Sequence, residues 1–327
     1  MKVWYDAGTG KQVRYAVAVA RHLRSLGHEV TLTTRKHPDT LPMAEFLEEK
    51  FIVVGRYNPK SLMTRLKESI RRQQFFCRMF DRKALDVAIS HGSVDQCRVA
   101  FGLGIPLIST VDIAYAETVH RLTLTLSDYI IASKALPRRI LQAYNFGGRI
   151  ESFDGVDEVA WIKDFEPKTT FDFGKPLIVV RQLEEKAVYT KEKLDLLPLA
   201  KKLTQLGKVV FLSRYDRRPI KDLIVPKEFV DSPSLIAQAD LFVGVGGTST
   251  REAALLGVPA VVVNVFRRQH VNEFLAKKGF PIFRVESADA FRLSKKLLGK
   301  KYDVKHLLAQ LENPVDVIGH AVKKIGA

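Results

Sequence analysis

Cysteine is scarce in this chain of 327 residues, which contains only Cys77 and Cys97. Neither has a partner at C-x-x-C spacing, which argues against a metal cluster and against a disulfide framework. No apolar run reaches the ~20 residues that a membrane-spanning helix needs. The first residues, Met1 to Asp6, lack the apolar core of a signal peptide and are typical of a strand. We therefore expect a cytoplasmic chain whose membrane contacts, if it makes any, are peripheral.

Acidic residues are also in deficit, with 36 Asp and Glu against 52 Lys and Arg, so the formal net charge is +16. Such a balance favours anionic partners such as nucleotides, nucleic acid or an acidic membrane surface. An equally weighted alternative is that the basic residues simply solvate the outer faces of helices. The hydrophobic content of 46% is sufficient for a well-formed core.

The most informative stretch runs from Asp240 to Asn264. A short β-branched and aromatic run, 241–245, is typical of a strand buried on both faces. A glycine turn follows, then a helix that ends at Gly257-Val258-Pro259, then a second buried strand. Within the turn and the helix, we expect the phosphate-binding positions to include Gly246, Gly247, Thr248 and Ser249. We expect Thr248 or Ser249 to cap the helix and Glu252 to lie in its first turn.

This arrangement has a direct chemical consequence. A glycine-rich turn that feeds a helix N-terminus leaves several N–H groups without intrahelical partners. Such groups bind anions, most often phosphates. The stretch therefore predicts a phosphate site.

A second glycine turn, with Gly8 and Gly10, lies between the first strand and a helix predicted from about Lys11 to Leu26. It lacks the third glycine of a dinucleotide fingerprint, and Thr34-Arg35-Lys36 stands where that fingerprint has an acidic residue. We therefore reject a nicotinamide cofactor and predict no cofactor. Gly8 and Gly10 are instead expected to let a substrate approach the end of the first strand.

Two polar residues follow strands in this half of the chain. His91 comes directly after the predicted strand 86–90, and Asp112 follows the strand 106–109. Ligands of open α/β sheets bind at the carboxyl ends of strands. His91 and Asp112 are therefore the candidate catalytic residues.

Strands alternate with helices over residues 1–150, and the rhythm breaks around 145–148. An irregular polar segment then reads as an interdomain connection over 151–170, after which the alternation restarts over 171–327. This pattern predicts an α/β protein with two Rossmann-like domains, whose parallel sheets face each other across a cleft. The C-terminal helix is free to pack back on the first domain.

In the second domain, Arg181 and Arg214 follow predicted strands near the glycine turn, and His270 opens a later helix. The arginine fork suits phosphate oxygens. The two arginines, the free N–H groups and the helix dipole together predict a diphosphate site that needs no metal. Taken singly, each arginine is equally an ordinary charge at a strand end.

A basic helical region spans 60–83. It is open to two interpretations: a peripheral membrane surface, or an amphipathic helix that packs on the sheet with a solvated basic face. The apolar stripe consists of Leu62, Leu66 and Ile70, and the basic residues are Arg65, Lys67, Arg71, Arg72, Arg78, Arg82 and Lys83.

The whole pattern resembles the GT-B architecture. The run Gly246-Gly247-Thr248-Ser249-Thr250-Arg251-Glu252-Ala253-Ala254-Leu255-Leu256-Gly257-Val258-Pro259 is similar to the donor-binding segment of nucleotide-sugar glycosyltransferases. It is also similar to the matching segment of non-hydrolysing UDP-N-acetylglucosamine 2-epimerases. This resemblance implies that the turn holds a diphosphate and that Glu252 binds ribose.

More closely, nearly the whole chain resembles domain-of-unknown-function family 354. Besides the glycine motif, the marks are Ser90-His91-Gly92-Ser93, Asp112, the segment 153–161 and Val180-Arg181. The chain departs from the family at 6–10, and it lacks an expected histidine in the run that begins at Asp112. The Gly-Thr-Arg-Pro-Glu pattern of the epimerases is missing as well.

The first hypothesis is therefore a metal-independent GT-B glycosyltransferase with a UDP-like sugar donor and an unidentified acceptor. His91 or Asp112 would act as general base, and Arg181 would offset charge on the leaving diphosphate. The second hypothesis is a sugar-nucleotide 2-epimerase or hydrolase on the same scaffold. The third is a non-enzymatic nucleotide or nucleic-acid binder, although no motif for specific nucleic-acid recognition is present.

Overall fold

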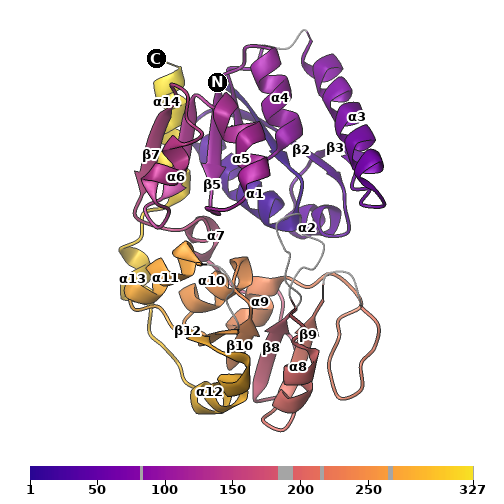
Figure 1. Cartoon of the computed structure of the whole chain (residues 1–327), viewed down its shortest axis with the longest axis vertical. Coiled ribbons are helices and arrows are strands. Elements are labelled where there is room, and N and C mark those ends of the chain that lie inside the picture. Colours follow the sequence, from indigo (N-terminus) through magenta and orange to yellow (C-terminus); the bar gives the residue numbers. More distant parts are fainter. Residues whose placement is uncertain (82–83, 183–193, 214–216, 264–267, 327) are drawn as a thin grey trace. The chain divides into compact units, whose positions relative to one another are not determined.

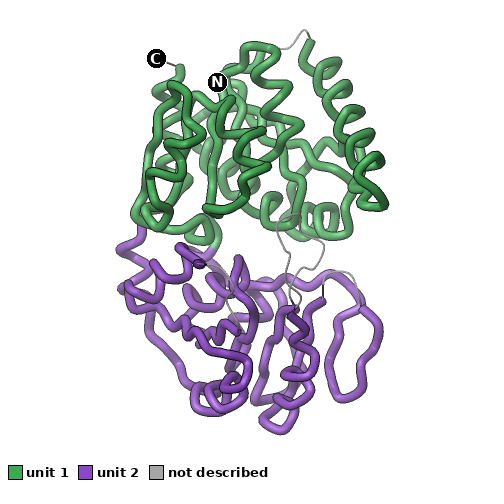
Figure 2. Tube along the Cα trace, viewed as in Figure 1, with its two compact units in different colours: residues 1–161, 312–327 green, residues 162–311 purple. Residues whose placement is uncertain are grey.

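The structure is a computed structural model that describes residues 1–81, 84–182, 194–213, 217–263 and 268–326 (Figure 1). The chain divides into two compact units (Figure 2). Unit 1 contains Met1–Trp161 and Glu312–Ala327, and unit 2 contains Ile162–Leu311. The division after Trp161 lies inside the segment 151–170 that the sequence indicates as a connection.

Unit 1 is built on a seven-stranded parallel sheet with the order β3-β2-β1-β4-β5-β6-β7. Its order changes direction at β1, so the carboxyl ends of β1 and β4 lie side by side at a topological switch point. The strands are β1 Lys2–Ala7, β2 Glu29–Lys36, β3 Ile52–Arg56, β4 Val87–Ser90, β5 Leu107–Val111, β6 Tyr129–Ser133 and β7 Arg149–Phe153.

Strand β7 corrects the sequence analysis, which ends the alternation of strands and helices around 145–148, just before this strand. In β7 only Phe153 is buried, because the strand forms an edge of the sheet. An edge strand lacks the continuous apolar run of a central strand, so its sequence resembles a polar connection.

The helices of unit 1 cover the sheet. The C-terminal helix α14 belongs to this unit and packs against α1. The helices are α1 Gly10–Ser25, α2 Thr40–Phe46, α3 Leu62–Phe80, α4 Val94–Gly102, α5 Glu117–Thr123, α6 Arg138–Gln142, α7 Val159–Ile162, which crosses into unit 2, and α14 Pro314–Ile325.

Trp4 in β1 anchors one side of the core. Its ring lies 4.5 Å from that of Phe80 and 4.8 Å from that of Phe76, both on α3. The indole nitrogen donates a 3.0 Å hydrogen bond to Thr33 Oγ1, so the buried polar atom is satisfied. This packing holds α3 against the sheet.

Unit 2 contains a five-stranded parallel sheet with the order β12-β11-β10-β8-β9. Alternate residues of β8 enter two separate apolar clusters, Ile178 and Val180 on one face, Leu177 and Val179 on the other. Both faces are therefore covered, as the continuous apolar strands predict. The strands are β8 Leu177–Arg181, β9 Lys208–Leu212, β10 Leu241–Gly244, β11 Ala260–Val263 and β12 Ile282–Val285.

The helices of unit 2 are α8 Leu197–Leu203, α9 Ser232–Ala237, α10 Thr248–Leu255, α11 His270–Lys277, α12 Ala290–Leu297 and α13 Lys305–Ala309. In the described residues α8 begins at Leu197, later than the helix start that the sequence indicates near 191, and it has Pro198 in its first turn. Among the residues that the structure describes, none of the helices is long and apolar enough to cross a membrane.

Candidate functional site

Four charged or titratable side chains meet at the carboxyl edge of the unit 1 sheet. His91 follows β4, Asp112 follows β5, Asp157 follows β7, and Lys11 lies in the first turn of α1. Lys11 Nζ is 2.5 Å from Asp112 Oδ2 and 2.9 Å from Asp157 Oδ2. It also lies 3.3 Å from His91 Nε2. We call these four residues the Lys11 cluster.

The imidazole of His91 is held from several sides. Its Nδ1 lies 2.7 Å from Thr110 Oγ1, and its ring packs edge-on against Tyr15 at 5.5 Å. The backbone oxygen of His91 accepts a 2.6 Å hydrogen bond from Gln12 Nε2. Because Nδ1 is engaged by Thr110, Nε2 is the nitrogen that faces Asp112 Oδ1 at 3.4 Å and Asp157 Oδ2 at 3.7 Å.

The cluster also has the residue types of a metal site. His91, Asp112 and Asp157 each offer one ligand atom, and these atoms lie within 4.8 Å of one another. The ammonium of Lys11 lies within hydrogen-bonding distance of all three residues. The ammonium of Lys11 therefore supplies the positive charge that a metal ion would supply between these three side chains.

Two tyrosines lie beneath this site. Tyr5 and Tyr15 are fully buried, and no hydrogen-bond partner is found for either hydroxyl among the residues that the structure describes. Burial raises the pKa of both phenols well above 10.0, and the negative charge of Asp157 raises it further. Both phenols therefore stay protonated at neutral pH, so neither serves as a general base.

The glycines predicted at this edge lie close to protein atoms. The N–H of Gly8 donates a 2.7 Å hydrogen bond to Gln12 Oε1, which links the turn to the residue that holds His91. Gly10 begins α1, and an added Cβ there would lie 3.3 Å from Asp39 Cβ. The turn therefore positions Lys11 and Gln12 at the start of the helix.

A second buried network ties α3 to the same sheet. Asp6 in β1 is fully buried and accepts hydrogen bonds from Arg72 at 2.7 and 3.0 Å. Arg72 also donates to Asp95 at 2.8 Å, and Ser93 donates to Asp6 at 2.5 Å. Burial lowers the pKa of Arg72, but Asp6 and Asp95 outweigh this effect and raise it. Arg72 is therefore a buried cation with two anionic partners.

In unit 2 the glycine turn has the backbone geometry that the sequence indicates. Gly246 and Gly247 have φ of 98° and 93°, a left-handed conformation that favours glycine. The capping prediction is wrong: Gly247 is the N-cap of α10, and glycine has no side chain with which to cap the helix. Thr248 and Ser249 are themselves the first two residues of α10. The helix begins one residue earlier than it would with Thr248 as its N-cap, so Glu252 lies beyond the first turn.

The structure describes three of the remaining predicted positions of unit 2, Glu252, Arg181 and His270. Glu252 is buried and accepts a 3.2 Å hydrogen bond from Ser232 Oγ. Arg181 is the last residue of β8, which pairs with β10, the strand before the turn. His270 is the first residue of α11, and Arg214 lies outside the described residues.

Sequence comparison matches residues 1–326 to the family described as "Protein of unknown function (DUF354)". The chain belongs to this family. The resemblance that the sequence indicated is thus confirmed over the whole chain. An uncharacterised protein of Methanocaldococcus jannaschii is 30% identical to this DUF354 chain, and the alignment covers 97% of the chain and 96% of that protein.

The solved structures with the same fold include members of two groups. UDP-N-acetylglucosamine 2-epimerases represent one: a putative enzyme from Listeria monocytogenes has a TM-score of 0.71 at 14% identity, covering 100% of this chain and 95% of that one. The epimerase from Methanocaldococcus jannaschii has a TM-score of 0.69 at 14% identity, with 99% of both chains covered.

A glycosyltransferase from Streptomyces sp. SF2575, complexed with thymidine diphosphate, represents the other group. Its TM-score is 0.62 at 18% identity, and 99% of both chains is covered. The DUF354 chain therefore has the GT-B-like fold with two Rossmann-like sheets, as predicted. Because both groups share this fold, the likeness does not select between their activities.

The structure adds two residues to the predicted site of unit 1. Neither Lys11 nor Asp157 was predicted, although it is Lys11 that joins His91 to Asp112. A signal for each was present: Lys11 directly follows the glycine turn, and Asp157 lies within the 153–161 segment that marks the DUF354 resemblance.

Proposed function

We propose that this protein is a GT-B glycosyltransferase that transfers a hexosyl or N-acetylhexosaminyl group from a UDP-like donor without a metal ion. The observation that carries the proposal is the Gly246-Gly247 turn, which ends in the glycine N-cap of α10, within a GT-B-like fold. In this proposal unit 2 holds the donor and unit 1 activates the acceptor.

The donor site follows from the backbone of the turn. Because the N-cap of α10 is a glycine, no N-cap side chain competes for the first N–H groups of the helix, which suit phosphate oxygens, and the helix dipole favours negative charge there. Arg181 ends the neighbouring strand β8 and offsets the charge of the leaving diphosphate. The thymidine diphosphate bound by the Streptomyces enzyme supports a nucleoside diphosphate as the ligand class.

The acceptor chemistry follows from the Lys11 cluster. In an inverting transfer the acceptor hydroxyl attacks the anomeric carbon while the bond from that carbon to the diphosphate oxygen breaks. The hydroxyl proton passes to His91 Nε2, and the nearby carboxylates of Asp112 and Asp157 stabilise the imidazolium that forms against the repulsion of the Lys11 ammonium 3.3 Å away. Asp112 is the alternative base, because its carboxylate lies at the same edge.

Calorimetric titration with UDP and UDP-sugars tests the donor site. We expect the wild-type protein to bind UDP, and Glu252→Gln to weaken binding by about tenfold through the loss of a charged ribose contact. Glu286→Gln changes an exposed glutamate of the same unit and serves as the matched control. Absence of UDP binding by the wild-type protein at millimolar concentration would contradict the proposal.

NMR of a UDP-sugar incubated with the protein, without any acceptor, separates the transferase from the alternatives. A transferase leaves most of the donor intact. Epimer or free sugar as the main product would establish the epimerase or hydrolase activity instead. Binding to random RNA with a steep salt dependence, in the absence of UDP binding, would indicate a nucleic-acid binder.

A further inference from the structure

The outward face of α3 carries an apolar stripe. Leu62, Leu66 and Ile70 are 82%, 55% and 46% exposed, and they recur every four residues, so they lie along one side of the helix. Met63, at 58% exposed, lies beside them. We call these four residues the α3 stripe.

The stripe is not the side of α3 that builds the core. A different set of residues, also four apart, is buried against unit 1: Glu68, Arg72, Phe76 and Phe80. Arg72 is fixed by Asp6 and Asp95, and Phe76 and Phe80 pack on Trp4. The helix is therefore held firmly by its inner side and lies at the edge of unit 1 (Figure 1), while the side chains of the α3 stripe are exposed.

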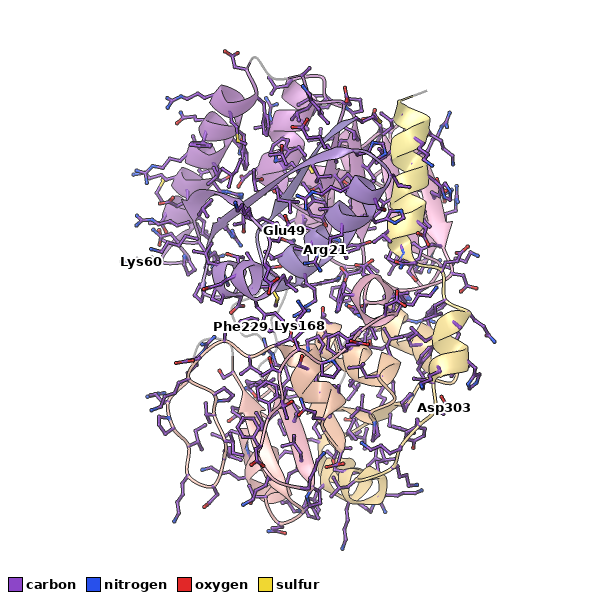
Figure 3. All side chains as sticks on the ribbon, turned by 180° about the vertical axis from the view of Figure 1, so that it is seen from behind. Arg21, Glu49, Lys60, Lys168, Phe229 and Asp303 are labelled. Atoms are coloured by element: carbon purple, nitrogen blue, oxygen red, sulfur yellow. The ribbon has the colours of Figure 1, made fainter. Side chains whose placement is uncertain are left out.

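Basic residues flank the stripe on one side. Lys67, Arg71 and Arg78 are exposed and share a neighbouring side of the helix, since they are separated by four and seven positions. Lys60, labelled in Figure 3, is also exposed and lies just before the helix. The outer surface of α3 thus combines apolar side chains with a row of positive charge.

We propose that this surface docks the protein on an anionic lipid membrane. The α3 stripe enters the boundary between headgroups and acyl chains, while Lys60, Lys67, Arg71 and Arg78 contact lipid phosphates. Charge favours a lipid surface over a second copy of the chain, because pairing two α3 helices would bring rows of like charge together on molecules of net charge +16.

Co-sedimentation of the full chain with vesicles tests this docking surface. We expect binding to vesicles of equal parts phosphatidylglycerol and phosphatidylcholine, weaker binding at high salt, and little binding to phosphatidylcholine alone. Leu66→Gln combined with Ile70→Gln removes half of the stripe and should weaken binding by at least about tenfold. Lys67→Gln combined with Arg78→Gln should weaken it by roughly tenfold on anionic vesicles.

Matched controls lie elsewhere on the surface. Phe146→Gln alters a side chain that is 81% exposed, and Lys295→Gln with Lys296→Gln removes two exposed charges from α12. Both controls should bind like the wild-type protein. Circular dichroism confirms that the variants are folded, as expected for substitutions of exposed residues.

Three results would overturn the proposal. One is the absence of wild-type binding to the anionic vesicles, and another is an equal loss of binding in the controls. The third is a wild-type dimer in ultracentrifugation that the Leu66→Gln and Ile70→Gln pair converts to monomer. Vesicle binding requires no nucleotide, so this test stands apart from the proposed transferase activity.

Discussion

The ammonium of Lys11 donates a 2.5 Å hydrogen bond to Asp112, a residue that lies 101 positions further along the chain. The same ammonium reaches Asp157, so one cation contacts two carboxylates that follow different strands. In the folded unit the lysine therefore reduces the repulsion between Asp112 and Asp157, which share one edge of the sheet with His91.

Replacing Lys11 by Met should destabilise the protein by about 3 kcal/mol, because it leaves two largely buried carboxylates without their cation. Urea unfolding measures this loss. Lys134→Met, at an exposed position of the same unit, is the control and should change stability by less than about 0.5 kcal/mol.

The same Lys11→Met variant should also gain affinity for Zn²⁺, because the three remaining side chains are suitable ligands within 4.8 Å of one another. We expect Zn²⁺ to raise the melting temperature of this variant more than that of the wild-type protein. Equal stability of the variant and the wild type, with no response to Zn²⁺, would show that Lys11 does not neutralise this cluster.

Replacing Arg72 by Met should cost about 3–5 kcal/mol in the free energy of unfolding, because Asp6 and Asp95 lose a buried cation. Arg71→Met is an adjacent control on the same helix. Arg71 pairs with Glu68 while remaining 65% exposed, so its loss should cost at most about 1 kcal/mol. Similar losses in the two variants would contradict the structural role of the Arg72 network.

The glycine turn allows a paired comparison. Gly246 and Gly247 both have positive φ, and Gly247 with ψ of −167° lies in a region that is essentially restricted to glycine, so alanine at either position should cost about 1–3 kcal/mol of backbone strain. Gly246→Ala should cost more, because its Cβ would overlap the amide of Gln269, which donates a 2.7 Å hydrogen bond to the backbone oxygen of Val245. A Cβ at Gly247 meets no atom within 4 Å.

Chemical denaturation of the two variants measures the difference. Adding Gln269→Ala to Gly246→Ala should recover the part of the loss that arises from the overlap. If Gly247→Ala proves the more damaging of the two, the contact with Gln269 does not determine the cost of alanine at Gly246.

His120 should make stability depend on pH. Its side chain is buried against Tyr144, and burial lowers its pKa from the ordinary value of 6.5, against a smaller opposing effect of Asp112 and Glu117. The unfolded chain therefore binds a proton more readily than the folded one. Stability is unaffected by this group above pH 6.5 and falls as pH drops from that value towards the lower pKa of the folded state.

His120→Phe removes this titration and keeps an aromatic ring beside Tyr144. The variant should lose less stability than the wild type when urea unfolding is compared between about pH 7 and about pH 5. His320→Gln, at an exposed position, should leave the wild-type pH profile unchanged. An identical profile for His120→Phe would exclude this histidine as the source.

Much of the fold could be predicted from local patterns. The central strands were recognised because parallel strands buried on both faces give continuous apolar runs, as in β4 and β8. The edge strand β7 was missed because its residues are mostly half-exposed. The N-cap of α10 was misplaced because glycine at positive φ takes a place that the sequence pattern assigns to threonine or serine.

For the candidate site, the sequence alone predicts which residues follow strands. It therefore predicts that His91 and Asp112 lie at the sheet edge where ligands bind. It also predicts the glycine turn at Gly246-Gly247, since a sharp turn depends on local backbone freedom. Only the tertiary structure shows that Lys11 and Asp157 join His91 and Asp112. It alone also shows that, on α3, Arg72 is buried and Leu66 is exposed. The physical reason is that strand order places distant residues side by side, and charges brought together in a buried place must find partners there.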